Sequence, residues 1–137
     1  MKWKLITERE EKTFALVFDD GDEVVSSLTH FARERQLNAS DFSGIGACAR
    51  VTLGLFELER KDYKRIHIDE QVEVMSVLGN ITLNEKGEPK VHGHMVVGKS
   101  DGVAYGGHLF EAHVRPTLEL FLVEHPLQLQ RKMNEQI

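Results

Sequence analysis

The chain has 137 residues, of which 41% are hydrophobic and 28% charged, as expected for a single domain over residues 1–137 with its own core. A net charge of −5 argues against a protein that coats nucleic acid, because Lys and Arg supply nonspecific affinity for phosphates. No apolar run approaches the ~20 residues of a membrane span, and the charged N-terminus lacks the apolar segment of a signal peptide. The lone cysteine, Cys48, is expected to be buried and unreactive. Together these features predict a cytoplasmic protein.

The first third of the chain is predicted to form a strand followed by a helix. Residues 13–18 are apolar enough for a buried strand, and Asp22 is expected to cap the helix that follows. Over residues 23–36 the apolar side chains recur at helical spacing, which indicates one amphipathic helix. His30 lies among the polar residues of that helix and is expected at its surface.

After Asn38 the pattern predicts strands only. A long strand over residues 42–59 is expected to bend or bulge, because it contains Gly44, Gly46 and Gly54. The fold class is therefore predicted to be α+β, a largely antiparallel β-sheet with one main amphipathic helix. The basic segment 60–65 is flanked by acidic residues and is expected to be a solvated loop face. The other predicted strands cover residues 63–68, 71–83, 114–123 and 127–130, with a histidine-bearing hairpin before the last two.

Three histidines around a short turn give the strongest functional signal. His92 and His94 point the same way from a strand, with Cα atoms roughly 6.6 Å apart. If residues 100–102 form a three-residue loop with positive φ at Gly102, His94 lies directly opposite His108. A two-residue loop would instead turn His108 to the other face, because a one-residue slip inverts every side chain.

The apolar residues of this hairpin favour the three-residue loop. That register places the histidines on the face that also carries Gly98 and Gly106, which leave room beside the imidazoles. The opposite face is expected to be core and gathers Val91, Met95, Val97, Val103, Tyr105 and Leu109.

A metal site at His92, His94 and His108 is the resulting prediction. Three imidazoles without a thiolate suit zinc or a similar divalent ion, with a fourth position for water, a small anion or a neighbouring subunit's group. His113 and His125 fall outside the register and are expected to be dispensable. The alternative is that the three histidines are unrelated polar positions on a solvated strand face.

Several of these segments resemble the PPC domain, the "plants and prokaryotes conserved" domain. Residues 71–79, Gln-Val-Glu-Val-Met-Ser-Val-Leu-Gly, are similar to the family's Phe-Glu-Ile-Leu strand. His92-Gly93-His94, Asp101-Gly102 and Gly106-Gly107-His108-Leu109 resemble its second signature in the bacterial and archaeal form. Order and spacing hold from about residue 10 to 133.

The resemblance implies a PPC-domain fold, a homotrimer and, as in prokaryotic members, a metal bound by histidines matching His92, His94 and His108. Plant members join the domain to an AT-hook, an Arg-Gly-Arg-Pro element that reads the minor groove of A·T-rich DNA. This sequence contains no such element and resembles the prokaryotic stand-alone form. The family's DNA-binding label is therefore disfavoured here, as it is by the charge, although a trimer could still gather basic loops on one side.

Two functions remain open beside DNA binding. The first is a trimeric binding or regulatory module that carries a His₃ metal. The alternative is a small metal-dependent enzyme that uses the open position of a His₃ zinc site. No catalytic residue is identified; Glu73 and Asp101 are the acid–base candidates. Glu73 fits a solvent-facing strand carboxylate as well, and Asp101 fits a turn former whose side chain bonds its own backbone.

Overall fold

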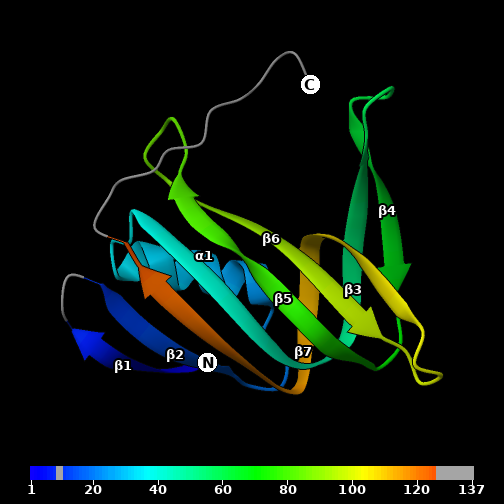
Figure 1. Ribbon diagram of the computed structural model, residues 1–137, viewed down its shortest axis with the longest axis horizontal. Coiled ribbons are helices and arrows are strands. Elements are labelled where there is room, and N and C mark those ends of the chain that lie inside the picture. The colour runs from blue at the N-terminus through cyan, green and yellow to red at the C-terminus, as the bar shows by residue number, and fades with distance from the viewer. Residues whose placement is uncertain (9–10, 126–137) are drawn as a thin grey trace.

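A computed structural model describes residues 1–8 and 11–125, and within them seven strands and one helix (Figure 1). Every strand pairing is antiparallel, and the strand order is β1-β2-β7-β6-β5-β3-β4. This arrangement confirms the predicted antiparallel sheet with one helix. The elements are β1 (Lys2–Glu8), β2 (Lys12–Phe18), α1 (Val24–Glu34), β3 (Ala39–Glu57), β4 (Asp62–Ile68), β5 (Val72–Leu83), β6 (Pro89–Gly98) and β7 (Ala104–Glu124).

The two longest strands, β3 and β7, pair with each other and close the sheet on itself. Their register runs from Ser40 opposite Glu124 to Gly54 opposite His108. β5 pairs with the first half of β3, β6 pairs with β5, and the first part of β7 pairs with β6, so these four strands form a closed ring. Both long strands bend sharply at one end of the molecule (Figure 1).

The predicted bend in β3 lies at its glycines. The register shifts between Gly44 and Gly46 against β5, and again after Gly46 against β7. A Cβ atom at Gly44 would lie 2.9 Å from the Leu120 Cα, and one at Gly46 would lie 2.5 Å from the Leu118 Cα. Glycine is therefore required there because the two backbones approach too closely for a side chain.

The core lies inside this ring and is completed by α1, which Figure 1 shows behind the sheet. The helix buries Val24, Leu28, Phe31 and Ala32. Its cap differs from the prediction, because Glu23 rather than Asp22 occupies the N-cap. The Glu23 carboxylate accepts hydrogen bonds from the backbone N–H of Ser26 at 2.7 Å and of Val25 at 3.0 Å, and it also accepts one from Ala112 N–H on β7 at 3.0 Å.

Asp22 has a different role. Its carboxylate accepts a hydrogen bond from Asp19 N–H at 2.9 Å and pairs with the N-terminal amine at 2.8 Å. A longer glutamate reaches both the first turn of the helix and the neighbouring strand, which the shorter Asp22 side chain does not do. The sequence pattern alone favours the aspartate, since Glu is not a common N-cap residue.

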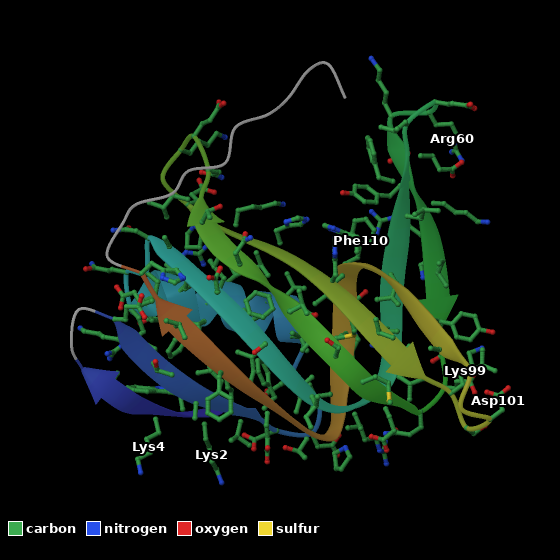
Figure 2. The ribbon with its side chains drawn as sticks, in the orientation of Figure 1. Lys2, Lys4, Arg60, Lys99, Asp101 and Phe110 are labelled. Atoms are coloured by element: carbon green, nitrogen blue, oxygen red, sulfur yellow. The ribbon has the colours of Figure 1, made fainter. Side chains whose placement is uncertain are left out.

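Two other strands differ from the prediction. β1 was not predicted, although Trp3 and Leu5 alternate with Lys2 and Lys4; it is an edge strand whose two lysines point away from the sheet (Figure 2). β7 is one 21-residue strand that joins the second arm of the hairpin to the predicted strand at 114–123. The predicted strand at 127–130 lies outside the described residues. Lysines on an edge strand disfavour pairing with other chains.

Cys48 is buried, as predicted, and burial raises the pKa of its thiol to about 12. Such a thiol stays protonated at neutral pH and is a poor nucleophile.

In the described part of the chain, α1 is too short to cross a membrane.

Candidate metal centre

The hairpin that carries the histidines has the predicted register. Lys99 N–H donates to the Val103 carbonyl at 3.0 Å, and Gly102 has a φ of +81° at the end of the three-residue loop. Counting back along the ladder, His94 stands directly opposite His108. The three-residue loop is thus confirmed, and with it the placement of both histidines on one side of the hairpin.

The apolar side of the hairpin is core over most of its length. Met95, Val97 and Leu109 are buried, as predicted, and Val91 is half-buried. Val103 and Tyr105 were also expected in the core, but both are exposed. They follow the loop directly, where the Lys99 ammonium lies 4.7 Å from the Tyr105 ring centroid and both apolar side chains keep contact with solvent.

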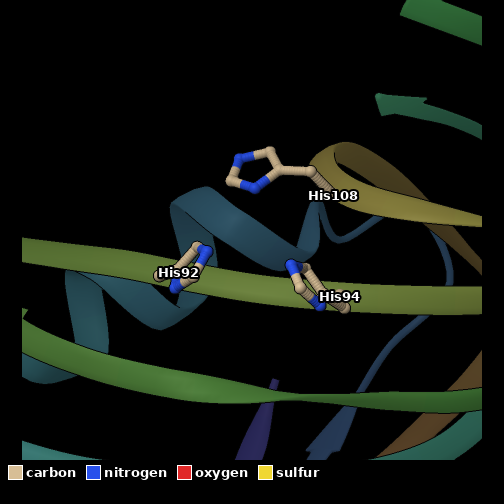
Figure 3. A group of neighbouring side chains, drawn as sticks. All are labelled: His92, His94 and His108. Atoms are coloured by element: carbon tan, nitrogen blue, oxygen red, sulfur yellow. The ribbon is translucent and has the colours of Figure 1, made fainter. Parts of the chain in front are cut away.

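The three histidine side chains converge on one another (Figure 3). The His92 ring centroid lies 5.3 Å from that of His94 and 5.3 Å from that of His108. One ring nitrogen from each residue lies within 4.8 Å of the other two. Tetrahedral zinc with Zn–N bonds near 2.0–2.1 Å requires nitrogens roughly 3.3 Å apart, which side-chain rotations can provide. This donor set fits a borderline divalent ion.

Two aromatic residues, Tyr63 on β4 and Phe110 on β7, flank His108. The Tyr63 and Phe110 ring centroids each lie 4.7 Å from the His108 ring centroid, and 5.0 Å from each other. Gly54 stands directly opposite His108, and a side chain there would overlap the Phe110 ring. The glycine therefore leaves space for the aromatic residues that hold the His108 ring.

An open pocket of about 430 Å³ lies beside the cluster. His94 and His108 form part of its wall, and the opposite wall comes from β3 and β4 through Phe56 and Tyr63. Figure 2 places Phe110 in the angle between β6 and these two strands. Together these positions leave room beside the imidazoles for a small ligand.

Neither acid–base candidate lies at the cluster. Glu73 stands opposite Gly98, four residues along β6 from His94, which is roughly 13 Å of strand. Asp101 is at the loop tip, far from Phe110 (Figure 2), and its carboxylate accepts a hydrogen bond from Val103 N–H at 2.9 Å. Asp101 is thus a turn former, as its position in the loop suggested, and neither carboxylate lies beside the histidines.

The remaining histidines lie outside the cluster. His113 contacts Glu111 at 2.6 Å, and His125 contacts Asp41 at 2.7 Å. The hydrogen bond that the imidazole donates to the Asp41 carboxylate raises the pKa of His125, which marks an ion-paired imidazole. His67 lies 3.1 Å from the Thr52 hydroxyl, and His30 is on α1.

The strand predicted over residues 63–68 is confirmed as β4, but sequence reasoning missed the place of Tyr63 and Arg65 beside the cluster, because the segment from Arg60 to Arg65 was interpreted as a solvated face. Residues 58–61 do form the turn, but Asp62 begins β4. The Arg65 guanidinium carbon lies 3.9 Å above the Phe110 ring. Alternation along the predicted strand already places both side chains on one strand face, but no local signal links that face to the histidines.

Comparisons with known proteins agree with this geometry. A family model described as the Plants and Prokaryotes Conserved (PCC) domain matches residues 6–126. A comparison with curated protein sequences gives no match.

Three solved structures are similar over almost their whole length. A plant- and prokaryote-conserved protein from Pyrococcus horikoshii is 29% identical, with a TM-score of 0.86 over 98% of this chain and 90% of the other. A protein from Archaeoglobus fulgidus, described as metal-containing, is 30% identical, with a TM-score of 0.85 over 99% and 94%. A Bacteroides thetaiotaomicron protein with a provisional DNA-binding label is 25% identical, with a TM-score of 0.86 over 98% and 92%.

Two adjacent glycines beside His108 offer a matched test of this geometry. A Cβ atom at Gly107 would lie 2.5 Å from the Gly54 carbonyl oxygen, whereas one at Gly106 would first meet the Val96 side chain at 3.3 Å. We expect Gly107→Ala to lower the free energy of unfolding by about 1–3 kcal/mol through overpacking against backbone. Gly106→Ala should change it by less than ~1 kcal/mol, because a side chain can move. Urea unfolding of both variants measures the difference, and equal destabilisation would contradict the close approach.

Proposed function

The chain belongs to the Plants and Prokaryotes Conserved domain family, and we propose that it serves as a homotrimeric module that binds a divalent metal ion such as zinc. His92, His94 and His108 are the proposed ligands. The observation that carries the proposal is the convergence of their ring nitrogens within 4.8 Å of one another. The metal-containing description of the Archaeoglobus fulgidus relative supports it.

The donor set also supports the choice of metal. Neutral imidazole nitrogens suit zinc and similar borderline ions, and three of them leave one coordination position for a further ligand. When bound, such an ion would supply a positive charge and a Lewis-acid position at the pocket wall. His108 is oriented by Tyr63 and Phe110, so one of the three ligands is held before the ion arrives.

Binding is favoured over catalysis because neither Glu73 nor Asp101 reaches the cluster. None of the residues that line the adjacent pocket, all within the described segments, is an aspartate or glutamate. General acid–base chemistry requires a group within hydrogen-bond reach of the reacting atom or one water away. The arrangement therefore supports a module that holds a metal and a ligand.

The proposed trimer is supported by the outer face of the sheet, the face turned away from α1. On β7, Leu118, Leu120 and Leu122 are buried while Phe121 points outward and is 54% exposed. Apolar patches of this kind commonly mark protein interfaces, and the family resemblance implies other copies of this chain as the occupant. The exposed apolar residues of this face are Ile45, Met75, Leu78, Val96 and Phe121.

The metal site has a direct test. His94→Ala should remove most of the bound zinc, because two imidazoles hold the ion far more weakly than three. His125→Ala serves as the control and should retain the wild-type metal content, since His125 pairs with Asp41 away from the cluster. Metal analysis of the dialysed proteins measures both. The site would be refuted by equal zinc content in wild type and the His94 variant.

The trimer is tested by introducing a charge into the outer face. We expect wild type to show a trimeric mass in light scattering at micromolar concentration, and Phe121→Glu to lower that mass because assembly would bury the carboxylate. Val103→Glu is the matched control, since Val103 is 47% exposed at the hairpin loop, away from this face. A monomeric mass for the wild-type protein would contradict the proposed trimer.

DNA binding is expected to be negligible at physiological salt, because the net charge of −5 offers little counterion release from phosphates. Fluorescence titrations with random and A·T-rich duplexes at ~0.15 M salt should give dissociation constants weaker than ~1 μM. Sub-micromolar binding with a steep salt dependence would show that basic loops in the assembly outweigh the net charge.

A further inference from the structure

We propose that Arg65 and the metal position together form a two-point site for a small dicarboxylate or a related acid with a second oxygen donor. One carboxylate would pair with the Arg65 guanidinium while the other oxygen occupies the open metal position. This inference rests on the proposed metal site and specifies the ligand class that the site would take. It assigns Arg65 a role in ligand recognition.

Strand pairing places Arg65 on the same face as the histidines. Arg65 on β4 is directly opposite Gly54 on β3, Gly54 is opposite His108 on β7, and His108 is opposite His94 on β6. Directly opposed residues of antiparallel strands project to the same side of the sheet. Because the residue in the middle of this row is glycine, the Phe110 ring can lie over it, between Arg65 and His108.

Packing holds the guanidinium near the cluster. Its central carbon lies 3.9 Å above the Phe110 ring, which also contacts the His108 ring at 4.7 Å and the Tyr63 ring at 5.0 Å. One aromatic ring therefore spans the distance between the arginine and the metal ligand. A guanidinium stacked on an aromatic face keeps its N–H groups at the edge of its plane, where they can donate to a carboxylate in a bidentate pair.

The charge balance at the site favours an anion. Three neutral imidazoles leave the charge of a divalent ion uncompensated, and Arg65 adds a further positive charge. The described residues that line the pocket beside His94 and His108 include no carboxylate that could neutralise either one. The nearby Glu57 is engaged with Arg60 at 3.3 Å. A ligand with two negative groups would satisfy both positive centres at once.

The geometry also favours a ligand with two separated groups over a single small ion. The guanidinium and the imidazoles lie on either side of Phe110, so an ion such as acetate can reach only one of them. A short dicarboxylate has two carboxylates to offer to the two centres. The open pocket of about 430 Å³ beside His94 and His108 is also lined by Tyr63, two residues from Arg65 on the same face of β4, and leaves space there for the carbon chain. Bidentate pairing with arginine would then distinguish it from a neutral ligand of the same size.

The test uses zinc-loaded, dialysed full-length protein titrated calorimetrically with malonate, succinate, glutarate and acetate. At least one dicarboxylate should bind about ten-fold or more tightly than acetate. Arg65→Gln should weaken that binding about ten-fold or more while keeping the wild-type zinc content, because a charged hydrogen-bond partner is lost. Lys64→Gln removes the same charge from the opposite face of β4 and should leave the affinity unchanged within about two-fold.

Two further samples separate the possible failures. Metal-free wild type should lose the dicarboxylate affinity. Arg65→Lys should bind the dicarboxylate with an intermediate affinity, because lysine keeps the positive charge but lacks the planar guanidinium with its paired N–H donors. Full zinc content without preferential dicarboxylate binding, or equal affinity in wild type and Arg65→Gln, would overturn this inference alone. A wild-type protein that takes up no zinc would overturn the proposed function and this inference together.

Discussion

β3 and β7 lie against each other for almost their whole length, and the close approach of their backbones determines where every other strand can go. The pairing runs from Ser40–Glu124 through the bend to Gly54–His108. At Gly44 and Gly46 a side chain would enter the β7 backbone, and at Gly107 it would enter the β3 backbone. Because these glycines allow the strands to stay paired through the bend, β7 reaches β6 as well, and the ring of strands closes.

The same closure brings the candidate ligands together. His92 and His94 come from β6, and His108 comes from the part of β7 that contacts β3 and β6 at once. β4 joins the far side of β3 and contributes Tyr63, whose ring packs on His108. A cluster assembled from three strands thus depends on one strand pair, and a change in the register of that pair would separate all of these side chains.

The histidine cluster and the exposed apolar residues lie on one surface. His94 is opposite Leu78 on β5, Leu78 is opposite Ser43 on β3, and Ser43 is opposite Phe121 on β7. A single row across the outer face therefore connects the cluster to the apolar residues proposed as the contact between copies of the chain. The proposed ligand site and the proposed contact between copies are neighbours in this arrangement.

The sequence was sufficient to predict the parts of this arrangement that depend on local rules. The helix and the hairpin follow from apolar spacing and from the positive φ that Gly102 supplies, and the strand period then places His94 opposite His108. The Glu23 cap could not be predicted in the same way, because it depends on a hydrogen bond to Ala112 from a distant strand. Arg65 and Tyr63 were missed for the same reason, since their proximity to the cluster arises from the β3–β4 and β3–β7 pairings rather than from neighbours in the chain.

The location of the imidazoles explains how such a site is compatible with a stable fold. His94 is exposed and His92 and His108 are half-buried, whereas Met95 and Leu109, the next residues along the same strands, are buried in the core. Strand alternation thus places the proposed metal ligands and the core side chains on opposite faces of the same two strands. The hydrophobic core is built from apolar side chains on the other face of these strands, away from the three histidines. Small zinc domains differ in this respect, because their folding energy comes largely from the metal. In this chain the proposed metal ligands project from strands whose opposite face carries an extensive apolar core.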